Sequence, residues 1–499
     1  MDAQEKVFFK RYSNYNSDNK GYIRLFDVVS LLKIYDEKVV RKQLAGDPVI
    51  NNLKQSKSYL IESILKSLTA YHSGETIDSM LFEYIHRIEI LKRKQLYKMA
   101  FKLISKAERL ALENERYPYL FVVLQFKLEL AEREKIHDLI FIKELSGTYK
   151  EVFEYLKLYK NNLKYKRLSQ YFAAHKMNNV IIDTETRMKL LRMTKDPLLA
   201  DEKNAFTTES KKIMFNTLGN IFGKLGEWDK TAYFSKRNLE LIESDRVKLA
   251  NFESHYLITG HNYLLALTKL RNYEEFRLGY SKMLNFYMTM PSKSKTPEAF
   301  GWILKIRLLF VSNCVNFLML DEGLSAALSL KRLIEKNMYH DKFLNAVLYY
   351  KFFAIYFFKA EYKKAILWLN KIIALGGESF NREIYEMSQL LLIVCHFELK
   401  NYTLLRYLTK AISGYREKAE GGLEFREEMI LFFNKTASEK DVNKDRYVGL
   451  YARIQKMLGD DTGANILDVF DFISWLESKI EDRPFAAVIK EKQSQKKLL

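Results

Sequence analysis

Apolar residues recur every three to four positions along much of this chain. The clearest case lies between residues 362 and 373. Its apolar positions are Tyr362, Ala365, Ile366, Leu369, Ile372 and Ile373. This spacing is typical of an amphipathic helix with one wide apolar stripe. The preceding segment, 346–360, is apolar on nearly all sides, as expected of a helix between two neighbours. We therefore predict a hairpin of two helices joined by a short turn at Glu361.

The same arrangement recurs elsewhere, so the chain has internal repeats. Segments 218–225 and 228–242 predict a second hairpin, and an earlier unit begins at 96–101 and continues through Ile104, Ala107 and Leu110. The residues that follow the predicted turns are Trp228, Tyr273, Gly323, Tyr362 and Tyr402. They are 45, 50, 39 and 40 residues apart. A period near 40 accommodates two helices of about 15–17 residues and two loops.

The repeats predict an all-α fold, an α-α superhelix in which antiparallel helical hairpins form a right-handed solenoid. The 499 residues would supply roughly eight to ten hairpins. Only 19 glycines and 6 prolines interrupt the chain, which favours helices. We expect a helical module at 1–75, repeats at 76–460 and capping helices at 461–499, with a frayed lysine-rich tail from residue 490.

Between the clear hairpins the pattern is less regular. Helices are expected at about 119–131, 134–160 and 163–178, and loops at 193–210, 290–297, 419–423 and 440–445, where proline, glycine or polar residues gather.

One hairpin resembles the tetratricopeptide repeat (TPR) family. In that family a Leu-Gly pair lets the second helix approach closely, an aromatic residue follows three positions later, and a glycine precedes the turn. Leu218, Gly219, Phe222 and Gly226 occupy those positions. The resemblance implies a TPR-like superhelix and, by analogy, a concave surface that holds peptides.

Other parts of the chain match the TPR pattern less closely. The second helix has Thr231 and Asn238 where the family prefers small residues, and the 346–373 hairpin has Phe352 and Phe353 in place of Leu-Gly. The sequence FDFISWLESKIEDRPF at 470–485 is similar to the carboxy-terminal cap of uncharacterised bacterial TPR-like proteins.

The formal charge of +19 is spread thinly rather than concentrated in one patch. Its densest stretch is KLYKNNLKYKR at 157–167, where helical spacing places Lys160, Lys164 and Arg167 near one face with Lys157 one turn away. Two interpretations are open for this face. It is either a solvated helix surface or a contact for phosphate or an acidic partner.

Cysteine usage and the apolar runs bear on the compartment. Cys314 and Cys395 each lie within an apolar run, so both are expected to be core residues without a disulfide, as in a reducing compartment. The first ten residues are charged, and the longest apolar run, 390–395, is far shorter than the ~20 residues of a membrane span. We therefore predict a cytoplasmic protein without a secretory signal or a membrane segment.

Residues 16–27, NSDNKGYIRLFD, imitate a calcium-binding EF-hand loop when aligned on Gly21. Asn16 and Asp18 would be the first and third ligands and Asp27 the twelfth. Lys20 and Arg24 fall where oxygen ligands belong and oppose a divalent cation. The alternative is a polar turn in which Asp27 caps a helix that starts near Val28.

No other motif predicts chemistry. The eight histidines are His72, His86, His137, His175, His255, His261, His340 and His396. Their spacing matches no zinc motif, and there is no glycine-rich phosphate loop or nucleophile elbow. His255 and His261 are six residues apart and face different sides of a helix, and the Glu274-Glu275 pair suits a helix start. We therefore predict no enzyme activity, no catalytic, cofactor-binding or metal-ligating residue, and no cofactor.

These observations favour a non-enzymatic scaffold that holds a peptide or helix of a protein partner on the concave face of the solenoid. The alternative is a sequence-independent nucleic-acid-binding solenoid, suggested by the net charge and the Tyr/Lys interleaving. A calcium-regulated adaptor, resting on residues 16–27 alone, is a third hypothesis. The identity of the partner and the oligomeric state do not follow from the sequence.

Overall fold

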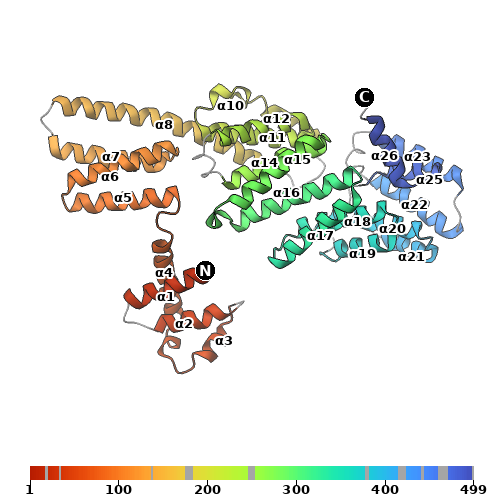
Figure 1. Ribbon diagram of the computed structural model, residues 1–499, viewed down its shortest axis with the longest axis horizontal. Coiled ribbons are helices and arrows are strands. Elements are labelled where there is room, and N and C mark those ends of the chain that lie inside the picture. The colour runs from red at the N-terminus through yellow and green to blue at the C-terminus, as the bar shows by residue number, and fades with distance from the viewer. Residues whose placement is uncertain are drawn as a thin grey trace. The chain divides into compact units, whose positions relative to one another are not determined.

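The computed structural model describes residues 1–16, 21–32, 35–135, 139–174, 184–244, 253–376, 381–413, 423–439, 443–458 and 470–496. Within these ranges every regular element is a helix, which confirms the predicted all-α class (Figure 1). The chain forms two compact units, Met1–Leu163 and Lys164–Leu499. Their boundary falls inside helix α8 (Leu139–Ala174) and within the predicted repeat region.

Unit 1 holds two separate groups of helices, each with its own core. The helices of the first group are α1 (Ala3–Asn16), α2 (Gly21–Leu31), α3 (Glu37–Gln43) and α4 (Leu53–Tyr71), with a 3-10 turn at Pro48–Ile50. They enclose Phe9, Leu25, Val40, Leu53 and Leu60. The second group comprises α5 (Ile77–Arg93), α6 (Tyr97–Glu113), α7 (Tyr117–Lys135) and the first part of α8, and its core includes Leu81, Ile88 and Ile104. The predicted division at residue 75 stays a prediction.

Unit 2 consists of successive helical hairpins. It begins with the end of α8, with α9 (Thr184–Met193), α10 (Pro197–Ala200) and a 3-10 turn at Glu202–Asn204. The hairpins are α11 (Thr208–Leu225) with α12 (Trp228–Glu243), α14 (Glu253–Lys269) with α15 (Tyr273–Thr289), α16 (Pro297–Asn316) with α17 (Leu320–Lys336), α18 (Lys342–Phe358) with α19 (Tyr362–Ile373), α20 (Arg382–Glu398) with α21 (Tyr402–Ser413), and α22 (Leu423–Glu439) with α23 (Lys444–Leu458). Each hairpin packs against the next, and α25 (Phe472–Ile480) and α26 (Phe485–Lys496) complete the unit (Figure 1).

A common turn closes most hairpins. At Ala360, φ is +55°, and its N–H donates to the carbonyl of Phe357 at 2.9 Å, while the N–H of Glu361 donates to the carbonyl of Tyr356 at 2.8 Å. This pair of bonds is the Schellman motif, which satisfies the last carbonyls of a helix. The same turn ends α5, α6, α11, α14, α16, α17, α18 and α20, and its left-handed residues are Gln95, Glu115, Gly226, Arg271, Leu318, Met338, Ala360 and Lys400. Only Gly226 among them is the glycine that this motif usually carries.

The prediction of a turn next to Gly323 was wrong by three residues. The turn residue is Leu318, and α17 starts at Leu320, so Gly323 lies inside that helix and is buried. A Cβ at Gly323 would lie 3.0 Å from the Cβ of Cys314, which is tighter than most such contacts, so the glycine eases the close approach of α16 and α17. Counted from the observed helix starts, the hairpins are 45, 47, 42 and 40 residues apart.

Three other boundary predictions were also wrong. The expected break near residue 161 is absent, because α8 continues through Asn161 and Asn162, whose side chains are buried. The expected loop at 193–210 contains α10 and a 3-10 turn, and the buried Leu199 and Ala205 anchor it in the core. The tail that was expected to be frayed from residue 490 is helical, since α26 runs from Phe485 to Lys496.

The two helices of the α11–α12 hairpin approach each other closely at Gly219. A Cβ built at Gly219 would lie 3.4 Å from Ser235 Oγ of α12, so this position faces the second helix at close range. Thr231, which departs from the family pattern, donates its hydroxyl to the carbonyls of Gly219 at 3.3 Å and Glu227 at 3.1 Å. The hydroxyl therefore has partners at an interface where an unpaired polar group would be costly.

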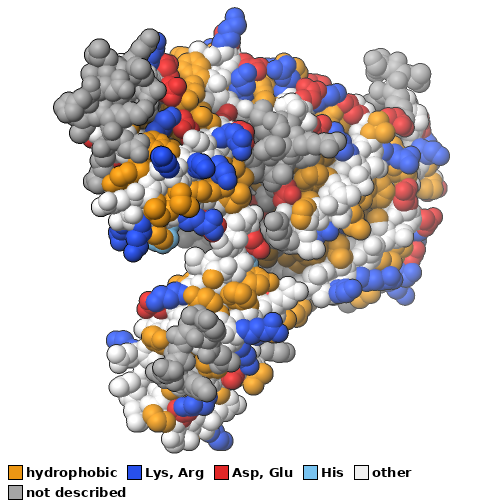
Figure 2. All heavy atoms as spheres, turned by 60° about the vertical axis from the view of Figure 1, so that its left-hand side comes forward, with side chains coloured by type: hydrophobic (Ala, Val, Ile, Leu, Met, Phe, Trp, Pro, Cys, Tyr) orange, Lys and Arg blue, Asp and Glu red, His pale blue; other side chains and the backbone are white. Residues whose placement is uncertain are grey.

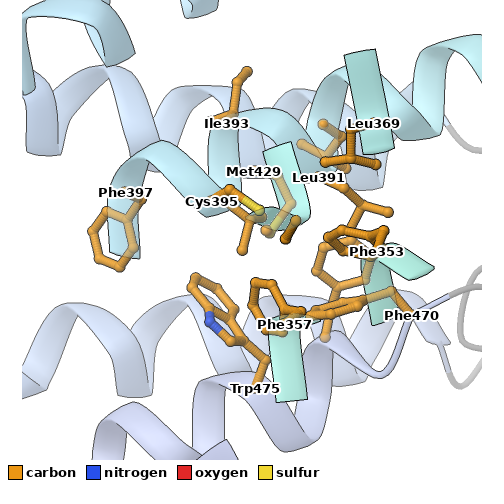
Figure 3. Packing of buried hydrophobic residues seen from close by; sticks show 14 of the residues in the cluster. Phe353, Phe357, Leu369, Leu391, Ile393, Cys395, Phe397, Met429, Phe470 and Trp475 are labelled. Atoms are coloured by element: carbon orange, nitrogen blue, oxygen red, sulfur yellow. The ribbon is translucent and has the colours of Figure 1, made fainter. Parts of the chain in front are cut away.

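The carboxy-terminal helices belong to the core of unit 2 (Figure 3). The ring of Phe470 lies 5.1 Å from that of Phe357 in α18, and Trp475 lies 5.8 Å from Phe397 in α20. Trp475 donates its indole N–H to Glu398 Oε1 at 2.6 Å, and Lys479 pairs with Glu398 Oε2 at 2.6 Å. Residues 470–480 are thus fixed against α18 and α20 by ring packing and one buried carboxylate.

Candidate functional site on the first helices

The first helices of four successive hairpins of unit 2, α11, α14, α16 and α18, follow one another in contact (Figure 1). We call them the first-helix row. Their acidic residues are confined to the first turn, at Glu209, Glu253 and Glu298, where the helix dipole favours negative charge, and α18 has none. Beyond the first turn the charged residues are basic: Lys212, Lys224, Lys269, Lys305, Arg307 and Lys351. The row therefore carries a positive potential along its length.

Polar and aromatic side chains join three helices of the row. Asn220 in α11 accepts a hydrogen bond from Asn262 Nδ2 in α14 at 3.5 Å. The neighbouring His261 places its ring 5.3 Å from that of Trp302 in α16, and Lys305 Nζ lies 4.3 Å from the centroid of the same indole. All five side chains are half-buried. Amides, an imidazole, an indole and an ammonium group are thus within reach of one ligand that lies across α11, α14 and α16.

The amides are held by their own helices. Asn220 also donates Nδ2 to the carbonyl of Asn216 one turn earlier at 2.8 Å, which leaves its Oδ1 directed to Asn262. His261 Nδ1 lies 3.3 Å from Asn262 Oδ1, so the imidazole and the amide share one contact. The row is therefore ordered before any ligand binds, which reduces the entropy cost of binding.

His255 in α14 belongs to a mostly buried polar cluster between α14 and α12. Asn238 of α12 places Nδ2 3.4 Å from both His255 Nε2 and Thr259 Oγ1. Burial lowers the pKa of His255 to about 3, and the nearby Lys212 ammonium adds to the effect. Burial likewise lowers the pKa of His261 to about 4, with Lys305 opposing its protonation. Both imidazoles are neutral at physiological pH and offer hydrogen bonds rather than charge.

The two cysteines are core residues, as predicted. Cys314 and Cys395 are both buried as free thiols. Burial raises the pKa of Cys314 to about 12, and burial also raises the pKa of Cys395. A thiol with so high a pKa is a poor nucleophile.

Within the EF-hand-like segment 16–27 the structure describes residues 16 and 21–27, and 21–27 lie in helix α2 (Gly21–Leu31) rather than in a loop. Gly21 is the first residue of α2, and Asp27 lies inside that helix, where it pairs with Lys10 at 2.6 Å. The interpretation of Asp27 as a cap for a helix starting near Val28 was therefore wrong, because α2 starts at Gly21. Arg24 bonds to Asp47 at 2.5 Å instead of facing a loop. Asp18 and Lys20 lie outside the described residues. In the part of the chain that the structure describes, no three His, Cys, Asp or Glu side chains are grouped for a metal ion.

The other candidates from the sequence lie apart from the row. His72 bonds to Glu5 and Glu75, His396 is half-buried beside Asn401, and His137 and His175 lie outside the described residues. Glu274 and Glu275 lie in the first turn of α15, as expected. The aromatic runs at 349–358 mainly pack in cores, as expected, since Phe352, Phe353 and Phe357 are buried.

Sequence reasoning missed Asn220, Asn262, Trp302 and Lys305 as a set. A signal was present, because Asn216 and Asn220 are four residues apart in the mainly apolar stretch 213–223 of α11. The link from α11 to α16 depends on which helices lie side by side, and no short motif encodes that.

Comparison with known proteins assigns no relationship: no protein-family model matches the chain, and neither does any curated protein. None of the described helices is both long enough and apolar enough to cross a membrane.

Proposed function

We propose that the protein is a non-enzymatic scaffold that holds a peptide or helix of a partner protein along the first-helix row of unit 2. The observation that carries this proposal is the continuous set of contacts from Asn220 through Asn262 and His261 to Trp302 and Lys305. Amide side chains can bond to a peptide backbone, and a half-buried indole offers the aromatic surface that dominates many protein interfaces.

The chemistry of the row supports binding rather than catalysis. Its two histidines are held neutral by burial, and both cysteines have raised pKa values. The basic residues beyond the first turns favour a partner segment that carries acidic side chains. The two buried free thiols suit a reducing compartment, so we place this function in the cytoplasm.

The carboxy-terminal helix α26 of the chain already contacts the carboxy-terminal ends of α16 and α18 in the first-helix row. Phe485 stacks on Phe358 of α18 at 5.0 Å, and Gln493 donates to the carbonyl of Asn316 at the end of α16 at 2.7 Å. The partner segment is therefore assigned to α11, which holds Asn220, to α14, which holds Asn262, and to the first half of α16, which holds Trp302.

Affinity capture with point variants tests this proposal. The wild-type chain should enrich at least one protein from a lysate of its source, and Lys305→Glu or Trp302→Ala should lose that protein. The matched control is Arg332→Glu on the second helix α17, which changes charge equally on an exposed position. A partner retained by Lys305→Glu and Trp302→Ala, or no enriched protein at all, would contradict the proposal.

Nucleic acid is the second candidate, and the stacking of Lys305 on Trp302 is the observation that favours it. Base stacking on an indole with a nearby cation is one way to hold a single strand without reading its sequence. A fluorescent single-stranded RNA should then bind at ~50 mM salt, weaken steeply by ~200 mM, and be lost with Lys305→Glu. No binding at ~50 mM would end this alternative.

A further inference from the structure

An exposed apolar row follows helix α8 within unit 1. Tyr149, Phe153, Leu156 and Leu163 are 43%, 60%, 42% and 46% exposed. Their spacing of four, three and seven residues is that of a heptad seam, with Lys160 at the intermediate position. At about 100° per residue, all five positions fall within about 40° of one line along the helix.

The core of unit 1 does not use this row. The buried side of α8 is adjacent to it and contacts α7 through Tyr155 and Tyr159. The ring of Tyr155 lies 6.5 Å from that of Tyr117, and the ring of Tyr159 lies 5.8 Å from that of Phe121. Since α8 already packs through this side, the exposed row is available for a different contact.

The free edge of the row is basic. Helical spacing places Lys150 and Lys157 directly beside the apolar positions, and Lys160 lies within the row itself. Glu154 lies further round the helix and pairs with Lys157 at 2.7 Å. Figure 2 shows one face of the molecule, on which hydrophobic and basic side chains lie next to each other in several places. A partner seated on the row would therefore meet ammonium groups along one edge.

We propose that this row, Tyr149 to Leu163, docks an amphipathic helix of another protein whose apolar seam is flanked by Asp and Glu. The heptad spacing fits the side chains of a facing helix over about 21 Å, and acidic flanks would pair with Lys150 and Lys157. A second copy of α8 would instead bring lysine against lysine. A helix that lies on a bilayer buries an apolar face at least about 100° wide, and this row is narrower than that.

This contact is separate from the first-helix row and gives a role to the basic stretch at 157–167. The test uses full-length protein and a fluorescein-labelled synthetic helix of four heptads, with Leu at the seam and Glu at the flanking positions. Its counterpart has Lys at those flanks. The Glu peptide should bind more tightly. Phe153→Glu should weaken it by about tenfold or more, because the seam loses an aromatic anchor and gains a repelling charge.

Charge reversal makes the test specific. Lys150→Glu combined with Lys157→Glu should reverse the preference toward the Lys peptide. Leu278→Glu, an equally drastic change at a 75% exposed position of α15, should leave binding unchanged. Lys305→Glu should also leave it unchanged, which separates this result from a failure of the proposed function. Circular dichroism of each variant verifies folding.

Three outcomes would overturn the inference. The first is equal binding of the Glu and Lys peptides, or no binding of either. The second is co-sedimentation with phosphatidylglycerol vesicles that Phe153→Glu abolishes, without peptide binding, which would assign the row to a membrane surface. The third is a dimer in sedimentation velocity that Phe153→Glu dissociates, which would assign it to a second copy.

Discussion

At the residue scale, the turns place ordinary L-residues in the left-handed backbone region that usually favours glycine. Leu318, Ala360 and Lys400 all have φ near +56°. An L-residue in this region costs roughly 1–2 kcal/mol relative to the right-handed helix. The two Schellman hydrogen bonds and the packing of the two helices offset that cost at every turn.

Gly226 offers a direct measure of this cost. We expect Gly226→Ala to destabilise the α11–α12 hairpin by about 1 kcal/mol, since a Cβ there meets no atom within 4 Å and the effect is confined to the backbone. Amide hydrogen exchange in α11 should quicken accordingly. The matched change Ala360→Gly relieves the same strain in an equivalent turn and should not quicken exchange in α18. Faster exchange in both would contradict this account.

Glu398 provides the second residue-scale prediction. Its carboxylate is 8% exposed and accepts from Trp475 while pairing with Lys479. Glu398→Ala removes both contacts and leaves the buried indole N–H of Trp475 without this acceptor, so we expect a loss of about 2 kcal/mol in the free energy of unfolding of unit 2. Thermal denaturation followed by tryptophan fluorescence measures this loss. Glu481→Ala, at an exposed position of the same helix end, should have little effect.

At the scale of elements, periodicity predicted helices well where one face is apolar and the ends carry a signal. The prediction for 362–373 matches α19, and that for 228–242 ends one residue before α12 does. It failed where burial contradicted local composition. Asn161 and Asn162 read as a break but are buried within α8, and Gly323 read as a turn but allows two helices to touch.

Helix α4 ends in a contact that responds to pH. His72 bonds to Glu75 Oε2 at 2.7 Å and to Glu5 Oε1 of α1 at 2.8 Å, and these hydrogen bonds raise its pKa. A raised pKa in the folded state stabilises the contact fully below the unfolded pKa of about 6.5, and this gain is lost as the pH rises through the folded value.

We therefore expect the α1–α4 contact to be stronger at pH 6 than at pH 8.5. Amide protection factors in α1, corrected for intrinsic exchange rates, should fall over this range. His72→Gln should give low protection at both pH values. Protection that is equal at the two pH values in the wild type would refute the assignment.

At the scale of the whole molecule, the chain divides into two compact units. Among the described residues, unit 1 has its own buried hydrophobic clusters at 9–60 and 81–130, and the clusters of unit 2 begin at Tyr165. We expect a fragment of residues 164–499 to fold on its own. Its circular dichroism should be helical and its thermal unfolding cooperative, and an unstructured fragment would contradict this division.

The sequence predicted the architecture more fully than the candidate site. Repetition of apolar spacing indicated hairpins without any knowledge of neighbours. In contrast, the link between Asn220 and Trp302 spans three helices, and the boundary between the two units at residue 163 lies inside the continuous helix α8. Both depend on packing between elements, which local patterns do not encode.

The shared turn also bears on how such a chain can change its length. Because a leucine, an alanine, a lysine or an arginine serves at the same joint, the connection between helices places little demand on sequence. A duplicated hairpin would carry its own turn with it, whereas its connections to the neighbouring hairpins would have to form anew, since those at Met290 and Met338 differ in backbone geometry. Growth of such a chain is therefore limited by the connections between hairpins rather than by the turns within them.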